Sequence, residues 1–184
     1  MAFTFIIFWK SAAEVGETIV LVTFATPIVG QQSAELINTL FWVSATIGRA
    51  AAIFFARFPS KIMLFFELVG SLISVIAWLS NFENVVVIWV TTITFGFFVG
   101  PLYPTIVASI ESFVPLTGSI TIFFVIAGGI GDFLSSIVIL NLIAAYGSIS
   151  FPICILVSVI GMLLGHVLVL FLGFKDQKQI SFKL

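Results

Sequence analysis

The sequence predicts an all-α membrane protein with six transmembrane helices, and two observations carry this fold class. Of its 184 residues, 61% are hydrophobic and 8% are charged, against about a quarter charged in soluble domains. Apolar runs of about 20 residues, enough to cross a hydrocarbon core of roughly 30 Å, recur along the whole chain. With a formal net charge of -1 and no basic patch before the C-terminal tail, nucleic-acid binding is not expected.

The six predicted spans are separated by short segments that contain proline, glycine or clustered polar residues, as turns require. Residues 1–174 are therefore expected to form one six-helix transmembrane domain, followed by a short cytoplasmic tail over 175–184. In chain order the predicted spans are residues 3–25, 34–56, 61–79, 85–110, 119–142 and 149–174.

Loop charges predict the orientation of these spans. With the N-terminus in the cytoplasm, the loops on the opposite side contain no Lys or Arg, so the positive-inside rule places both termini in the cytoplasm. Trp78 and Trp89, near span ends, are expected to be interfacial anchors. The cytoplasmic cations are then Arg57, Lys61, Lys175, Lys178 and Lys183.

Three charged residues form a stripe on the first span. Lys10, Glu14 and Glu17 fall within an arc of roughly 60° on a helix. Lys10 and Glu14, four residues apart, are spaced to pair directly. We interpret the stripe as facing a water-filled cavity. The alternative is that Lys10 reaches the cytoplasmic surface and the glutamates are buried and protonated.

Arg49 lies within the second span, where its guanidinium stays charged. An ion of this kind costs about 2.5–3.5 kcal/mol near the bilayer centre, so it needs a partner. Glu111, at the cytoplasmic end of the fourth span, and Glu67, in the third, are the candidate anions. Arg49 is expected to clamp one conformational state, and direct contact with a substrate is the alternative.

Asp132 is the deepest aspartate and lies within the fifth span. An intramembrane carboxylate of this kind can bind a proton or a sodium ion and so couple transport to a gradient. The alternative is that it stays protonated and hydrogen-bonds a neighbouring helix. No metal site or organic cofactor is expected, and sodium or a proton would be a co-transported ion.

The fourth span is interrupted by glycine and proline. Gly96, Gly100 and Pro104 follow one another at a spacing of four, which lets two backbones approach closely. Pro101 and Pro104 each remove a helical hydrogen bond, which frees carbonyl groups near Phe97 and Gly100. We interpret this span as a kinked or gating element, with close packing alone as the alternative.

An enzyme is not expected. The run Gly129-Ile130-Gly131-Asp132 matches the Gly-x-Gly-Asp pattern of intramembrane aspartyl proteases, but that chemistry needs two aspartates that share a proton. The other aspartate of this chain is Asp176, in the predicted tail.

The two halves of the chain show a weak symmetry, because Gly48-Arg49 lies in the second span and Gly131-Asp132 in the fifth. Because three is an odd number, the first three and the last three spans insert into the membrane with opposite topology. Inverted three-helix repeats are typical of secondary transporters. Further motifs follow in colinear order: Glu14, then Leu40-Phe41-Trp42 and Thr46-Ile47-Gly48-Arg49, Tyr103-Pro104-Thr105 leading to Glu111, Thr117-Gly118-Ser119-Ile120, and Gly131-Asp132.

In these motifs the chain resembles the C-terminal six-helix half of a major facilitator superfamily transporter. More narrowly, it resembles the sodium-dependent glucose transporter-like family, also called major facilitator domain-containing protein 4. The sequence departs from that family's pattern at Val20, where the family has a tryptophan, and at Asp132, where it usually has glutamate. A family proline is also missing near Leu134.

The resemblance implies half of a twelve-helix fold built from a 3+3 inverted repeat, in the plasma membrane. It implies a secondary active transporter that moves a small polar solute, a sugar, with sodium or proton coupling by alternating access. The partners would be the lipid bilayer, the solute, and a second six-helix half or a homodimer partner. The alternative is a transport-incompetent six-helix protein that acts as an assembly or regulatory partner. The residues expected to contact the substrate are Glu14, Glu17, Trp42 and Tyr103, and those expected in ion coupling or gating are Lys10, Arg49, Glu111, Asp132, Gly100, Pro101 and Pro104.

Overall fold

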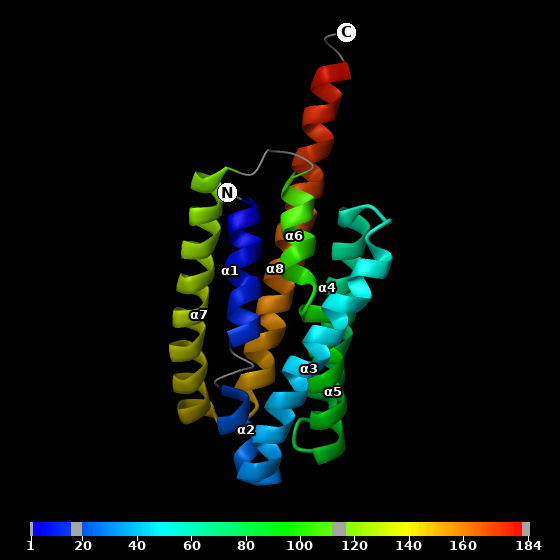
Figure 1. Ribbon diagram of the computed structural model, residues 1–184. Helices are drawn as coiled ribbons and strands as arrows, with labels where there is room; N and C mark the ends of the chain where they lie inside the picture. Colours follow the sequence, from blue (N-terminus) through cyan, green and yellow to red (C-terminus); the bar gives the residue numbers. More distant parts are fainter. Residues whose placement is uncertain (1, 16–19, 112–116, 182–184) are drawn as a thin grey trace.

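The computed structural model describes residues 2–15, 20–111 and 117–181, and these residues form a bundle of helices (Figure 1). The residues of these helices are mostly apolar, as expected for a bundle in lipid. In chain order the helices are α1 (Ala2–Val15), α2 (Leu21–Val29), α3 (Gln31–Phe55), α4 (Ser60–Ser80), α5 (Val85–Val99), α6 (Leu102–Glu111), α7 (Gly118–Tyr146) and α8 (Ser150–Ser181).

Five helices of the described part are long and apolar enough to cross a membrane. They match the second to sixth predicted spans with shifts of a few residues at their ends. The first predicted span falls on α1 and α2 and on the undescribed residues between them, and neither helix alone is long enough to cross. The count of six spans therefore stays a prediction. The five segments are Gln31–Phe55, Ser60–Ser80, Val85–Glu111, Gly118–Tyr146 and Ser150–Phe171.

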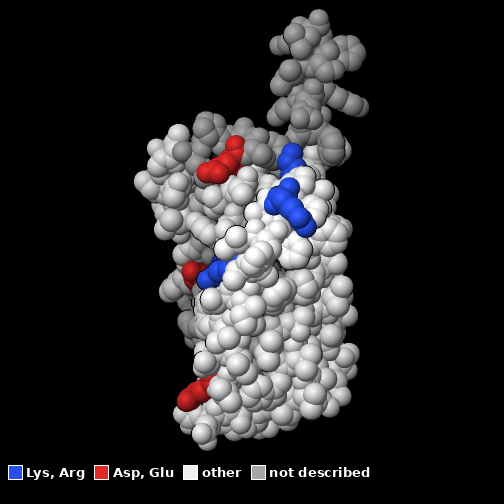
Figure 2. All heavy atoms as spheres, turned by 45° about the vertical axis from the view of Figure 1, so that its right-hand side comes forward, with Lys and Arg blue, Asp and Glu red and all other residues white. Residues whose placement is uncertain are grey.

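The helices run between two ends of the bundle (Figure 1). The start of α1, the α3–α4 connection and the end of α8 lie at one end, and the α2–α3 turn lies at the other. At that turn Gly30 has φ 82°, a conformation open to glycine. Figure 2 shows a surface on which few side chains are charged, as a lipid-facing protein requires.

Helix α8 continues to Ser181 and so includes most of the residues of the predicted tail. One feature differs from the sequence predictions. Trp78 was expected as an interfacial anchor, but its side chain is 0% exposed. It packs edge-on against Phe24 and Phe151, with ring centroids 5.7 and 5.4 Å away. This aromatic cluster joins α2, α4 and α8, so burial outweighed the interfacial preference of tryptophan.

Glycines set the closest helix crossings. A Cβ atom on Gly48 of α3 would collide with the carbonyl oxygen of Phe97 on α5, and one on Gly131 of α7 would collide with the carbonyl oxygen of Phe8 on α1. Gly100 faces the backbone of Ala45 in the same way. The prediction that small residues of the fourth span allow close backbone approach is confirmed. These crossings bring α1 against α7 and α3 against α5.

Candidate functional site

The interruption predicted in the fourth span lies between α5 and α6. Helix α5 ends at Val99, α6 begins at Leu102, and Gly100 and Pro101 separate them. Pro104 lies in the first turn of α6, where proline is tolerated. Because Pro104 has no N–H group, the carbonyl of Gly100 loses the helical donor four residues ahead. This carbonyl is therefore free to accept a hydrogen bond from another helix.

Arg49 of α3 supplies that hydrogen bond. Its Nε atom donates to the Gly100 carbonyl oxygen at 2.9 Å, and its Nη2 atom lies 3.3 Å from Oε1 of Glu14 on α1. The predicted partners Glu111 and Glu67 were wrong. Helical periodicity gives the face and depth of a residue on its own helix, but not which long side chains meet across helices. One guanidinium thus joins α1, α3 and the α5–α6 break.

Lys10 and Glu14 pair directly, as their spacing predicted, through Nζ and Oε2. Lys10 is 5% exposed, so it does not reach the surface as the alternative interpretation required. Its Nζ atom also lies 5.5 Å from the ring centroid of Tyr103, within the range of a cation–π interaction. Glu14 is therefore shared by two cations.

Asp132 of α7 lies beside this group. Its carboxyl group lies near the Ser11 hydroxyl and within the electrostatic reach of Lys10 and Glu14. Its Oδ1 atom is buried, and no residue in the described part of the chain hydrogen-bonds it. Ser11 lies on α1, so Asp132 meets a neighbouring helix at this point.

We call Lys10, Glu14, Arg49, Tyr103 and Asp132, together with the Gly100 carbonyl, the central polar cluster. It gathers two cations, two carboxyl groups and a phenol from α1, α3, α6 and α7 at the α5–α6 break. Arg49 and Tyr103 are reachable from outside, since the Arg49 side chain is 44% exposed and Tyr103 is 38% exposed. The cluster can exchange hydrogen bonds with a polar molecule and can rearrange its ion pairs when helices move.

The other predicted site residues lie away from the cluster or outside the described residues. Glu17 belongs to the undescribed segment. Glu111 is exposed at the end of α6. Trp42 is 36% exposed on α3 and packs edge-on against Phe41, with ring centroids 5.3 Å apart. Trp42 precedes Arg49 by seven residues, which places both on one face of α3.

That face of α3 carries a continuous polar stripe, which the sequence predictions did not include. Most of its members follow one another at three or four residues, the spacing of one helix face, and this spacing was the signal that could have found it. A shallow groove of about 470 Å³ runs along part of it, next to Trp42. The members of the stripe are Glu35, Asn38, Thr39, Trp42, Thr46 and Arg49, all partly or fully exposed.

Ser11 and the pair of Glu67 with Thr105 were also missed. Thr105 donates a hydrogen bond to Oε1 of Glu67 at 2.8 Å, so this glutamate is engaged away from Arg49. Single serine and threonine residues on apolar helices give no sequence signal of their cross-helix partners. Within the described residues, no three His, Cys, Asp or Glu side chains come together as a metal site.

Fold and cluster define a multi-pass helical membrane protein with buried ionisable residues, a combination typical of transporters. The chain is 30% identical to "Sodium-dependent glucose transporter 1A" of Mus musculus over 128 residues, which is 68% of this chain and 30% of the relative. It is 29% identical to "Major facilitator superfamily domain-containing protein 4A" of Homo sapiens over 127 residues, 68% of this chain and 25% of the relative. The same protein of Danio rerio is 26% identical over 152 residues, 82% of this chain and 28% of the relative.

The chain thus corresponds to part of a major facilitator superfamily protein. Its relatives belong to the group that includes the sodium-dependent glucose transporters and the major facilitator superfamily domain-containing proteins 4, as its motifs predicted. The matched part makes up less than a third of each of these relatives. No family model and no solved structure matches the chain.

Proposed function

We propose that this chain is the C-terminal six-helix half of a secondary active transporter. It would move a small polar solute, a sugar, by alternating access with sodium or proton coupling. The observation that carries the proposal is the polar stripe of α3, which leads along an exposed helix face to Arg49 in the central polar cluster.

A polar stripe on an exposed transmembrane helix is unfavourable against lipid, where a charged side chain costs about 2.5–3.5 kcal/mol near the centre. The stripe is therefore expected to face water. A water-filled cavity bounded by α3 would give a solute access to Trp42, Tyr103 and Glu14. The Trp42 ring offers an apolar face for a sugar ring, and the two polar groups offer hydrogen bonds.

The low burial of α3 and α7 supports the proposal that a partner packs against these two helices. Within their membrane-spanning windows, α3 and α7 have 28% and 22% of residues buried, against 39–50% for the other three spans. The curated relatives are more than three times as long as the matched part. A second six-helix half, or a second copy of this chain, would cover α3 and α7 and close the cavity.

The contacts of the two dipeptides Gly48-Arg49 and Gly131-Asp132 support a 3+3 inverted repeat. Gly48 meets Phe97, and the next residue, Arg49, bonds Gly100, three positions after Phe97. Gly131 meets Phe8, and the next residue, Asp132, lies near Ser11, three positions after Phe8. In both cases a glycine and the residue after it face two positions that are three apart, once between the second and fourth predicted spans and once between the fifth and first.

We assign the remaining residues roles that fit their positions. Asp132, with one unpartnered oxygen, is the proposed coupling site. Gly100, Pro101 and Pro104 form the proposed hinge, and Lys10 with Arg49 holds it closed through Glu14. Glu17 and Glu111 remain sequence-based candidates for solute contact and gating. We place the protein in the plasma membrane with both termini in the cytoplasm.

The test is uptake of radiolabelled D-glucose into vesicles that contain the purified chain, with a sodium gradient, a pH gradient or neither. Native mass spectrometry of the same sample gives the oligomeric state. Gradient-driven uptake by a dimer, or by the chain with a second half, supports the proposal. A strict monomer without uptake of D-glucose or of other labelled small polar solutes would favour the alternative, an assembly or regulatory partner.

A further inference from the structure

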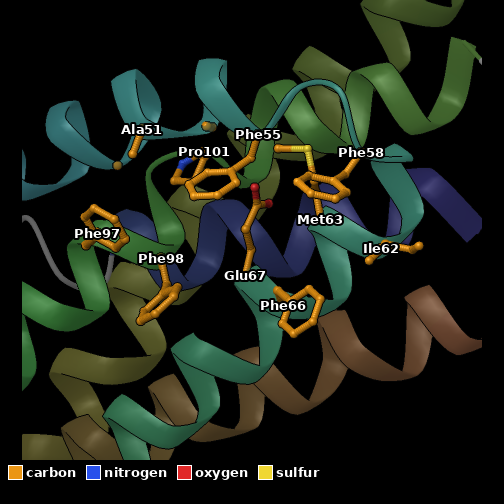
Figure 3. A pocket seen from close by; sticks show the side chains of 12 residues that line it. Ala51, Phe55, Phe58, Ile62, Met63, Phe66, Glu67, Phe97, Phe98 and Pro101 are labelled. Atoms are coloured by element: carbon orange, nitrogen blue, oxygen red, sulfur yellow. The ribbon is translucent and has the colours of Figure 1, made fainter.

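A second site lies between α3, α4 and the α5–α6 break. It is a cavity of about 570 Å³ (Figure 3), within the range of small-molecule pockets, about 300–1,000 Å³. None of the residues of the central polar cluster lines it. Its walls are apolar and rich in aromatic rings, contributed mainly by Phe55, Phe58, Met63, Phe66, Phe97 and Phe98.

One carboxyl group reaches into this apolar cavity. Glu67 is 7% exposed, and in Figure 3 its side chain points toward the space between Phe55, Pro101 and Met63. Its Oε1 atom accepts the hydrogen bond from Thr105, but its Oε2 atom is buried and has no partner among the described residues. A buried acceptor of this kind is unfavourable until a donor reaches it.

We propose that this cavity binds a lipophilic primary amine, with the apolar body among the aromatic rings and the ammonium group on Oε2 of Glu67. A charged amine supplies the missing donor and forms an ion pair with the carboxylate form of Glu67, and N⁺–H···O⁻ hydrogen bonds are roughly twice as strong as neutral ones. The faces of nearby aromatic rings also attract a cation.

Other occupants fit the site less well. A fatty acid would bring a second carboxylate to Glu67. A bare metal cation would meet one carboxylate and one hydroxyl, whereas calcium takes about six to eight oxygen ligands. A neutral alcohol can donate a hydrogen bond but forms no ion pair with the carboxylate form of Glu67. The amine proposal depends only on this cavity and does not rest on the proposed transport function.

The test measures equilibrium binding of 4-phenylbutylamine and of 4-phenylbutan-1-ol to the whole chain in lipid nanodiscs, with empty nanodiscs subtracted. The two probes share the apolar body and differ in the charged head. Saturable binding of one amine per chain, at least tenfold tighter than the alcohol, is expected. Equal affinities, or no saturable amine binding, would overturn the proposal.

Two variants locate the binding. Glu67→Gln keeps an acceptor for Thr105 but removes the charge, and Ala52→Phe fills the cavity from its wall; each should weaken amine binding at least tenfold. Glu83→Gln, an exposed loop carboxylate, and Ala50→Phe, an exposed position of α3, are the matched controls and should bind as the wild type does. If Glu67→Gln does not fold, the probe comparison and Ala52→Phe decide. Unchanged binding in a folded Glu67→Gln or Ala52→Phe variant contradicts the site.

Discussion

Arg49 donates a hydrogen bond from Nε to the carbonyl oxygen of Gly100 at 2.9 Å, across two helices. The carbonyl is free because the residue four positions later is Pro104, which has no N–H group. The helix break and the intramembrane arginine therefore satisfy each other. The helix break and the arginine are each unfavourable in a membrane when considered alone.

Pro104→Ala is expected to reduce the importance of Arg49. Alanine restores a backbone N–H group that can bond the Gly100 carbonyl within the helix. Hydrogen bonds across transmembrane helices average about 0.6 kcal/mol, with a maximum near 1.7. Arg49→Gln should therefore lower the free energy of unfolding less in the Pro104→Ala background than in the wild type. Denaturant unfolding in detergent micelles measures both differences, and equal losses would contradict the shared carbonyl.

Glu14→Gln is expected to destabilise the protein more than Arg49→Gln does. Removing Glu14 leaves Lys10, which is buried, and Arg49 without their shared carboxylate, whereas removing Arg49 leaves the pair of Lys10 with Glu14 intact. In a double-mutant cycle the two losses should be non-additive by about 0.5–3 kcal/mol, as for residues in contact. Glu83→Gln serves as the control. Strictly additive losses of unfolding free energy for Glu14→Gln and Arg49→Gln would contradict the ion-pair network.

Gly48→Ala and Gly131→Ala are expected to destabilise the protein, by about 1–3 kcal/mol each, because the added methyl group meets a backbone carbonyl that cannot move aside cheaply. Gly129→Ala is the matched control. Within the described residues, no atom outside its own helix lies within 4 Å of the Cβ position at Gly129, and replacing a helical glycine gains up to about 1 kcal/mol. Thermal unfolding measures the stability of all three variants. A loss of stability in Gly129→Ala equal to that in Gly131→Ala would contradict the close crossing of α7 with α1 at Gly131.

Asp132→Asn is expected to uncouple uptake from the ion gradient. The amide oxygen can still accept the hydrogen bond from Ser11, but the side chain can no longer change its charge. Gradient-driven uptake should fall to the level without a gradient, while solute exchange at equal concentrations persists. Asp132→Glu, which keeps the charge, is the control. Wild-type gradient dependence in Asp132→Asn would exclude this residue as the coupling site.

Several features of the fold followed directly from the sequence. The second to sixth spans, the interruption at Gly100-Pro101 and the pair of Lys10 with Glu14 depend on local hydropathy, local hydrogen bonding and helical spacing, all of which the sequence displays. The freed carbonyl at Gly100 was also predictable, because proline at a known position removes a known donor.

The partners across helices were not predictable. Arg49 was assigned to Glu111 or Glu67, although it bonds Glu14, because the neighbour of a helix depends on how the bundle packs. Trp78 was placed at the interface for a similar reason: its position near a span end is visible in the sequence, but the aromatic rings of Phe24 and Phe151 that bury it are not.

The shared carboxylate has a consequence for the biogenesis of this protein. Glu14 and Lys10 precede Arg49 in the chain, so during synthesis their helix emerges from the ribosome first. The glutamate and the first of its two cations are therefore already made when the arginine-bearing helix reaches the bilayer. The insertion cost of that later helix, about 2.5–3.5 kcal/mol for its arginine, then depends on a helix made earlier, and the Gly100 carbonyl completes the arrangement only when α5 and α6 arrive.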